Sequence, residues 1–171
     1  MRKLVFLAVL AFVAVPAAFA DDATTSSTAN ALCKQQRTTM GSKDFTSLYG
    51  GSSNAFGRCV SKVAGTLDSD HANAAKQCAA ERADANFATT HDGKTFDQLY
   101  GSGKNGGNAF GKCVSTKAQA LDQQNQQATL NAAKSCKSER TSMGAADFKT
   151  KYGGHANAFG KCVAKAAKAN P

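Results

Sequence analysis

Apolar residues in the second half of the chain recur with the spacing of an amphipathic α-helix. From Phe110 to Met143, counting about 100° per residue places the apolar side chains in one stripe about 80° wide. Asn108 is placed to cap the start of this helix and Gly144 to end it. The pattern predicts a helix of about 35 residues, roughly 50 Å long, unless the polar residues 122–127 interrupt it. The stripe consists of Phe110, Val114, Ala118, Leu121, Ala128, Ala132, Cys136 and Met143.

The stretch that begins at Phe56 has the same apolar face but a weaker middle. Gly65 and the polar residues 68–70 offer a break and a fresh N-cap. We therefore expect a kink or two helices here. The shared face consists of Phe56, Val60, Val63, Leu67, Ala74 and Cys78.

Short apolar segments with a Phe and a Tyr four residues apart separate the longer helices. Ser42 and Thr95 are expected as N-caps of short helices, because both types accept hydrogen bonds from backbone N–H groups. Left-handed glycine stops are expected at Gly50, Gly101 and Gly153. No β-branched run or sustained alternation predicts a strand, so the predicted fold class is all-α.

One pattern of residues occurs three times along the chain. Each copy has Cys-x3-Arg, then Phe-x3-Tyr-Gly, then Asn-Ala-Phe-Gly-(Arg/Lys)-Cys-Val. In the last segment we expect Asn to cap a helix, Phe and Val to pack inward, and Gly to admit a close neighbour; a ligand loop is the alternative. The chain thus divides into module 1 (31–67), module 2 (70–121) and module 3 (128–168). Nine extra residues in module 2 lie between Arg82 and Asn108, which is typical of a surface loop.

The first twenty residues have the layout of a secretory signal peptide. A basic start is followed by an uncharged apolar run and by small residues before a cleavage point after Ala20. A membrane anchor is the alternative, but the run is shorter than about 20 residues and contains Pro16. Residues 21–30, rich in Thr, Ser and Ala, are expected to form a flexible arm.

Six cysteines in an exported chain favour disulfides. The two cysteines of each module are 26, 35 and 26 residues apart. Because every module carries one pair, we predict pairing within modules, although pairing between modules is the alternative. Metal sites are disfavoured, since they need cysteines two to four residues apart and none here are closer than 19. The predicted bridges are Cys33–Cys59, Cys78–Cys113 and Cys136–Cys162.

The three bridges are expected to compensate for a thin core. Beyond residue 20 the chain has no Ile or Trp, and alanine supplies most of the apolar residues. At about 25 cal/mol per Å² of buried apolar area, alanine contributes little. Each bridge contributes about 3.5 kcal/mol by the chain-entropy relation.

The repeated modules resemble small exported proteins of high-GC bacteria. The resemblance covers most of residues 31–168 and is carried by the three motif segments named above. It implies export, and no functional residue is carried over from it.

Positive charge is the remaining functional signal. The formal charge is +9, and +7 without Arg2 and Lys3. The three histidines occupy unrelated positions of the repeat and suggest no catalytic constellation, so neither an enzyme nor a cofactor is predicted. Lysines and arginines flank the second cysteine of every module and form the candidate anion-binding set. They are Arg58, Lys62, Lys112, Lys117, Lys161 and Lys165.

The expected function is therefore a non-catalytic secreted or cell-envelope protein, binding or structural, whose basic surface meets an anionic partner. Cell-wall polyanion, membrane headgroups and nucleic acid are the candidate partners. The alternative is a secreted cationic effector such as a toxin, an antimicrobial or an enzyme inhibitor. The arginine that follows the first cysteine by four, Arg37, Arg82 or Arg140, is expected to bind a neighbouring group within the chain, or else an external carboxylate or phosphate.

Overall fold

The computed structural model describes residues 22–50, 52–103, 105–153 and 157–169. The predicted signal peptide and His155 lie outside these residues. Within them the fold is all-α, as predicted, with one isolated β-bridge between Ser102 and Gly107. The elements are α1 (Asp22–Met40), α2 (Ser42–Leu48), the 3-10 turn η1 (Ser52–Asn54), α3 (Ala55–Ala83), α4 (Phe87–Thr90), α5 (Phe96–Tyr100), α6 (Ala109–Met143), α7 (Ala145–Lys151) and α8 (Ala158–Ala169).

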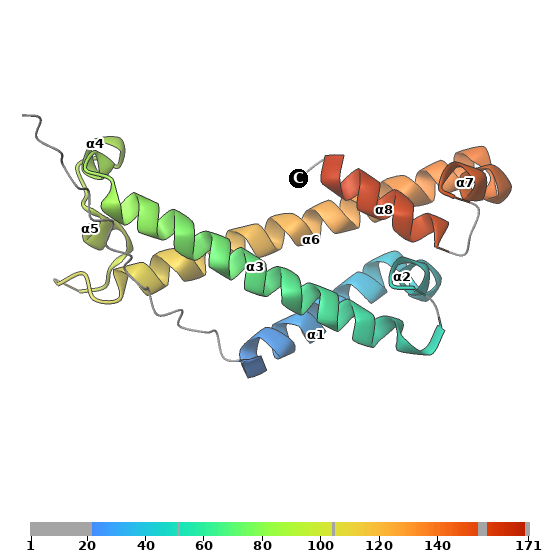
Figure 1. Cartoon of the computed structure of the whole chain (residues 1–171), viewed down its shortest axis with the longest axis horizontal. Coiled ribbons are helices and arrows are strands. Elements are labelled where there is room, and N and C mark those ends of the chain that lie inside the picture. Colours follow the sequence, from blue (N-terminus) through green and yellow to red (C-terminus); the bar gives the residue numbers. More distant parts are fainter. Residues whose placement is uncertain (1–21, 51, 104, 154–156, 170–171) are drawn as a thin grey trace, which may run out of the picture.

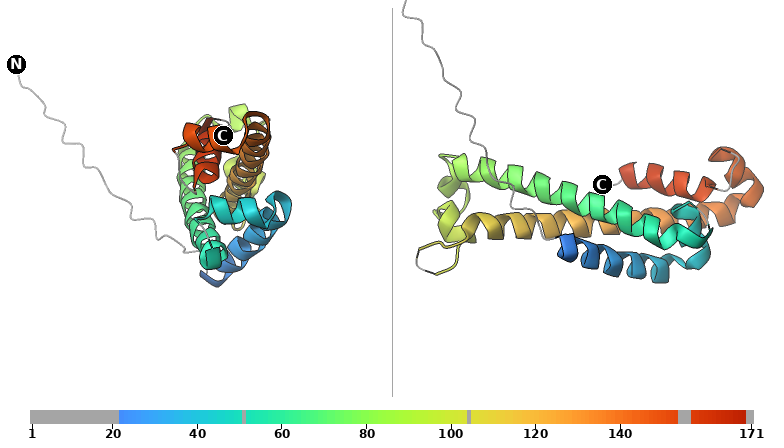
Figure 2. Two further views of the ribbon diagram at one scale, coloured as in Figure 1. Left: turned by 90° about the vertical axis from the view of Figure 1, so that its right-hand side faces the viewer. Right: turned by 60° about the horizontal axis from the view of Figure 1, so that its bottom comes forward.

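Two long helices, α3 and α6, pack side by side along the molecule, and the shorter helices lie at their two ends (Figure 1). The short helices α4 and α5 close one end. At the other end α1 packs on α3, α8 packs on α6, and α2 contacts α8 (Figures 1 and 2). Each long helix therefore closes one module and opens the next.

The predicted disulfide pairing is confirmed. Cys33–Cys59 joins α1 to α3, Cys78–Cys113 joins α3 to α6, and Cys136–Cys162 joins α6 to α8. All six cysteines are at most 2 % exposed. Each bridge thus fixes the two main helices of one module.

The buried side chains form two separate cores. Modules 1 and 3 share one, although about 100 residues separate them in sequence, and module 2 has its own. The larger side chains of the shared core are Met40, Phe45, Tyr49, Leu130, Phe148, Phe159 and Val163. The larger side chains of the module 2 core are Phe87, Phe96 and Val114.

The long helix predicted from Phe110 is confirmed, because α6 spans Ala109–Met143 with Asn108 and Gly144 at its ends. The predicted break in α3 is wrong. Ser69 Oγ donates a 2.8 Å hydrogen bond to the Gly65 carbonyl, and Asn125 of α6 donates to the buried Asp70. These polar groups are satisfied inside a continuous helix, so none has to cap a new one.

The flexible arm predicted for residues 21–30 is also wrong, since α1 is helical from Asp22. Ala29 is fully buried together with Cys33, and α1 packs on α3. Packing against a neighbouring helix therefore overrides a composition of modest helix propensity.

Two predicted caps differ from the structure, and a third is confirmed. Helix α2 begins after Gly41, whose φ of 84° turns the chain sharply from α1, so Ser42 is not the cap. Gly101 is extended rather than left-handed; a side chain there would collide with the Asp97 carbonyl and the Gly106 backbone. Thr95 does cap α5, through a capping box with Gln98.

The Asn-Ala-Phe-Gly signature has a local explanation. The asparagines at 54 and 108 make no side-chain cap hydrogen bond. Instead, a Cβ atom added to Gly57 would lie 2.5 Å from Asn54 Oδ1. A Cβ atom added to Gly111 would lie equally close, 2.5 Å, to Asn108 Oδ1. The glycine three residues on leaves room for the asparagine to fold over the first helical turn.

Candidate anion-binding surface

A tyrosine and a polar partner accompany each disulfide. In module 2 the Tyr100 hydroxyl donates a 3.0 Å hydrogen bond to Glu81 Oε2, which lies 3.9 Å from Cys113 Sγ. The same arrangement joins Tyr152 to Glu139 in module 3 and Tyr49 to Gln36 in module 1. Burial raises the pKa of Tyr49 to about 12. These clusters satisfy polar groups beside the core, and sequence reasoning missed them although a Gln or Glu precedes each repeated arginine.

The polar partner of the tyrosine is a glutamate in modules 2 and 3, where it forms a salt bridge with a nearby lysine, and a neutral glutamine in module 1. Lys117 Nζ forms a 2.9 Å salt bridge with Glu81, which raises the pKa of Lys117. In module 3 the hydrogen bond from Lys151, 2.6 Å from Glu139, lowers the pKa of Glu139. In module 1 Gln36 is neutral, and Lys62 lies over the Tyr49 ring at 5.9 Å instead.

The six predicted anion-binding residues do not form one surface. Lys112 and Lys117 lie near the start of α6, at the α5 end of the molecule, and the other four lie on α3 and α8 towards the opposite end (Figure 1). Arg58 donates a 2.9 Å hydrogen bond to the Gly50 carbonyl, and Lys117 is in its salt bridge. Lys62, Lys112, Lys161 and Lys165 are exposed.

The charge excess belongs almost entirely to the third module. Residues 21–127 contain eleven Lys and Arg against ten Asp and Glu. Residues 128–171 contain eight against two. Modules 1 and 2 are thus close to neutral, and the C-terminal quarter of the chain carries most of the net positive charge. Counting charges module by module would have shown this from the sequence.

Helix α8 presents a row of lysines to solvent. Lys161, Lys165 and Lys168 are four and three residues apart, so they lie on one face, and all are exposed. Phe159 and Val163, on the opposite face, are at most 3 % exposed. Six lysines of module 3 are exposed and form no salt bridge among the described residues. They are Lys134, Lys137, Lys149, Lys161, Lys165 and Lys168.

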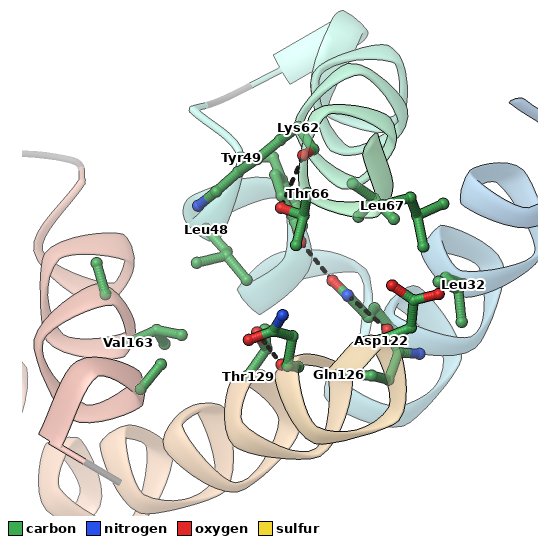
Figure 3. Close-up of a pocket in the computed structure, with 15 residues that line it drawn as sticks. Leu32, Leu48, Tyr49, Lys62, Thr66, Leu67, Asp122, Gln126, Thr129 and Val163 are labelled. Atoms are coloured by element: carbon green, nitrogen blue, oxygen red, sulfur yellow. Dashed lines mark hydrogen bonds between the residues drawn. The ribbon is translucent and has the colours of Figure 1, made fainter. Parts of the chain in front are cut away.

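A small cavity of about 100 Å³ lies where α1, α3, α6 and α8 meet (Figure 3). Apolar side chains such as Leu67 and Val163 line it, together with Asp122 and Gln126. Burial, and then the nearby Asp70 carboxylate, raise the pKa of Asp122 to about 6. Typical ligand pockets measure about 300–1,000 Å³, so this cavity is too small to rank with the basic surface as a candidate site.

No group of three or more His, Cys, Asp or Glu residues that could hold a metal ion is found in the part of the chain that the structure describes. His71 and His91 are half-buried rather than solvated, and the His91 ring stacks on Phe87 at 3.9 Å. None of the described helices is long and apolar enough to cross a membrane. Three disulfides with no free cysteine indicate folding in an oxidising, extracytoplasmic compartment.

No protein-family model matches the chain, and neither a curated protein nor a solved structure does.

Proposed function

We propose that this is an exported, non-catalytic protein whose third module binds an anionic polymer or surface. The observation that carries the proposal is the charge excess of residues 128–171, eight Lys and Arg against two acids. Six of those lysines are exposed and form no salt bridge within the described residues. Their positive charge is therefore available to an external partner.

The scaffold supports this role by fixing α8. The Cys136–Cys162 bridge ties α8 to α6, and buried Phe159 and Val163 hold its inner face in the shared core. A helix already in place loses little backbone entropy when its lysines meet a partner. Attraction of this kind is long-ranged but weakens with salt, with a Debye length of about 8 Å at physiological ionic strength.

The proposal is tested by measuring binding of oxidised residues 21–171 to polyphosphate, to duplex DNA and to anionic lipid vesicles over a salt series. The test variant combines Lys161→Gln, Lys165→Gln and Lys168→Gln. For duplex DNA, losing three phosphate contacts should reduce the slope of log K against log salt by about 2.7. Polyphosphate and vesicles distinguish a flexible polymer from a lipid surface as the preferred partner.

The matched control removes three exposed lysines outside module 3, by Lys76→Gln, Lys94→Gln and Lys112→Gln. Both triple variants have the same net charge. If net charge alone mattered, both would weaken binding equally, and the assignment to module 3 would be wrong. Absence of binding to all three probes at low salt would overturn the proposal altogether.

A further inference from the structure

Modules 1 and 3 are joined by a contact that is specific in shape and charge. Arg140, near the end of α6, holds the Asp44 carboxylate of α2 in a two-point contact, with Nη1 to Oδ1 at 2.8 Å and Nη2 to Oδ2 at 3.2 Å. The Asp44 side chain is only 6 % exposed. A paired, partly buried charge of this kind fixes the position of α2.

Two further residues of module 3 complete the contact. The Arg140 guanidinium lies over the Phe159 ring at 5.1 Å. A Cβ on Gly160 would lie 3.1 Å from the Leu48 carbonyl oxygen and 3.2 Å from that of Ser47, so the glycine admits the end of α2. We refer to Arg140, Phe159 and Gly160 as the receiving face of module 3, and to α2 as the docking helix of module 1.

Module 1 has a receiving face of its own, formed by Arg37, Phe56 and Gly57 at the equivalent repeat positions. The sequence Arg-Thr-x-Met-Gly occurs in both modules, at 37–41 and 140–144. No helix of the described chain docks on this face as α2 docks on module 3, although Phe56 also packs beside Phe45 at 6.4 Å between ring centroids. Arg37 is exposed and without an ion pair among the described residues, Phe56 is only half-buried, and a Cβ on Gly57 would meet only the Asn54 side chain.

Module 3 likewise has an unused docking helix, α7, with the backbone shape of α2. Both helices have seven residues and follow a glycine with nearly the same φ, 84° at Gly41 and 86° at Gly144. Each is followed by a tyrosine C-cap, with φ and ψ of −98° and 16° at Tyr49, and −104° and 23° at Tyr152. Asp147 occupies the position of Asp44, and it is exposed with no ion pair in the described residues.

Module 2 has neither element in this form. Its short helix α5 has five residues, and Thr95 stands where the docking helices have aspartate. Helix α3 ends at Ala83, one residue after Arg82, and Asp84 follows. In modules 1 and 3 the helix continues three residues beyond the equivalent arginine. The unused pair therefore consists of the receiving face of module 1 and the docking helix of module 3.

We propose that α7 of one copy docks on the receiving face of module 1 of a second copy, with Asp147 paired to Arg37 as Asp44 is to Arg140. Lys34 lies beside Arg37 around a shallow open depression, which adds positive charge opposite Asp147. Lys151 stands where α2 has Leu48, so the contact between copies loses one apolar anchor and is weaker than the contact within the chain. The two surfaces differ, so association is head-to-tail and produces open filaments or closed rings, of which the smallest is a dimer with two reciprocal contacts.

Charge reversal tests this arrangement directly. Sedimentation velocity of oxidised residues 21–171 should show a weight-average mass that rises with protein concentration. Asp147→Arg alone and Arg37→Asp alone should each lower the association constant at least about 30-fold, because like charges then face each other. In a 1:1 mixture of the two variants every contact again pairs Arg with Asp, so association should return.

The controls change charge by the same amount elsewhere. Asp68→Arg, at an exposed position of α3, and Arg82→Asp, at the equivalent arginine of module 2, should associate as the wild type does. A wild-type chain that stays monomeric at millimolar concentration would overturn the proposal. So would a mixture that associates no better than the single variants, and this readout remains independent of binding to anionic probes.

Discussion

Removing the Cys78–Cys113 bridge is expected to loosen module 2 while the shared core of modules 1 and 3 stays folded. The bridge closes a 35-residue loop, for which the chain-entropy relation gives about 3.8 kcal/mol of stabilisation. The core beneath it has few large side chains, chiefly Phe87, Phe96 and Val114. Module 2 therefore depends on its bridge for local order.

The effect has a size that hydrogen exchange can measure. A loss of about 3.8 kcal/mol corresponds to roughly 600-fold faster exchange of amides that open with the module, at 1.36 kcal/mol per factor of ten. In a Cys78→Ala, Cys113→Ala variant, exchange by mass spectrometry should accelerate across residues 87–110. Amides of α1, α7 and α8 should keep their wild-type rates, because they belong to the other core.

The matched control removes the bridge of module 3 by Cys136→Ala and Cys162→Ala. That bridge closes 26 residues and is worth about 3.5 kcal/mol on the same relation. Exchange should then accelerate in α8 and not in α4 or α5. If the two variants gave the same exchange pattern, or if removal of the Cys78–Cys113 bridge left exchange in α4 and α5 unchanged, the idea of two independent cores would be wrong.

Three further predictions concern the part of the molecule where modules 1 and 3 meet: Asp122, Gly160 and the Arg140–Asp44 ion pair. Asp122 has a folded pKa of about 6, above its unfolded value, so its contribution to stability is present below about pH 4 and lost as the pH rises through 6. Asp122→Asn should therefore raise the melting temperature at pH 7.5 and flatten the dependence of melting temperature on pH. Equal melting temperatures of variant and wild type at pH 7.5 would contradict this. Gly160→Ala should destabilise by roughly 1–3 kcal/mol in urea, because backbone of α2 blocks the added methyl group, whereas Gly57→Ala meets only a side chain and should be near neutral; equal effects would refute the argument. Arg140→Ala should cost about 1.5–3 kcal/mol by the same measurement, since it leaves the Asp44 carboxylate without its charged partner, and a loss below 0.5 kcal/mol would show the pair to be dispensable.

The sequence predicted those features that depend on local pattern or on repetition. The bridges followed from one cysteine pair per module, and α6 followed from an apolar stripe with end signals at Asn108 and Gly144. The break expected in α3 was wrong, because polar residues 68–70 would cap a new helix only if their side chains had no other hydrogen-bond partners. Asp70 has one, Asn125, 55 residues away on a neighbouring helix.

The association of modules 1 and 3 was beyond sequence reasoning for a similar reason. Arg140 and Asp44 are 96 residues apart, and every module carries an arginine at that position, so the pattern alone does not say which arginine meets which acid. For the basic surface, the repeat drew attention to positions shared by all modules. The uneven distribution of charge, which can be counted module by module in the sequence, distinguishes module 3 better than the shared positions do.

Because α3 and α6 each serve two modules, the chain is constrained in how its length can change. One residue added in the middle of α6 would turn everything beyond it by about 100° and shift it by about 1.5 Å, separating α7 and α8 from the helices they now contact. The loops near α4 and α5 carry no such penalty, and the nine additional residues of module 2 lie there. Insertions and deletions among variants of this chain should therefore be confined to its turns, while the lengths of the two long helices stay fixed.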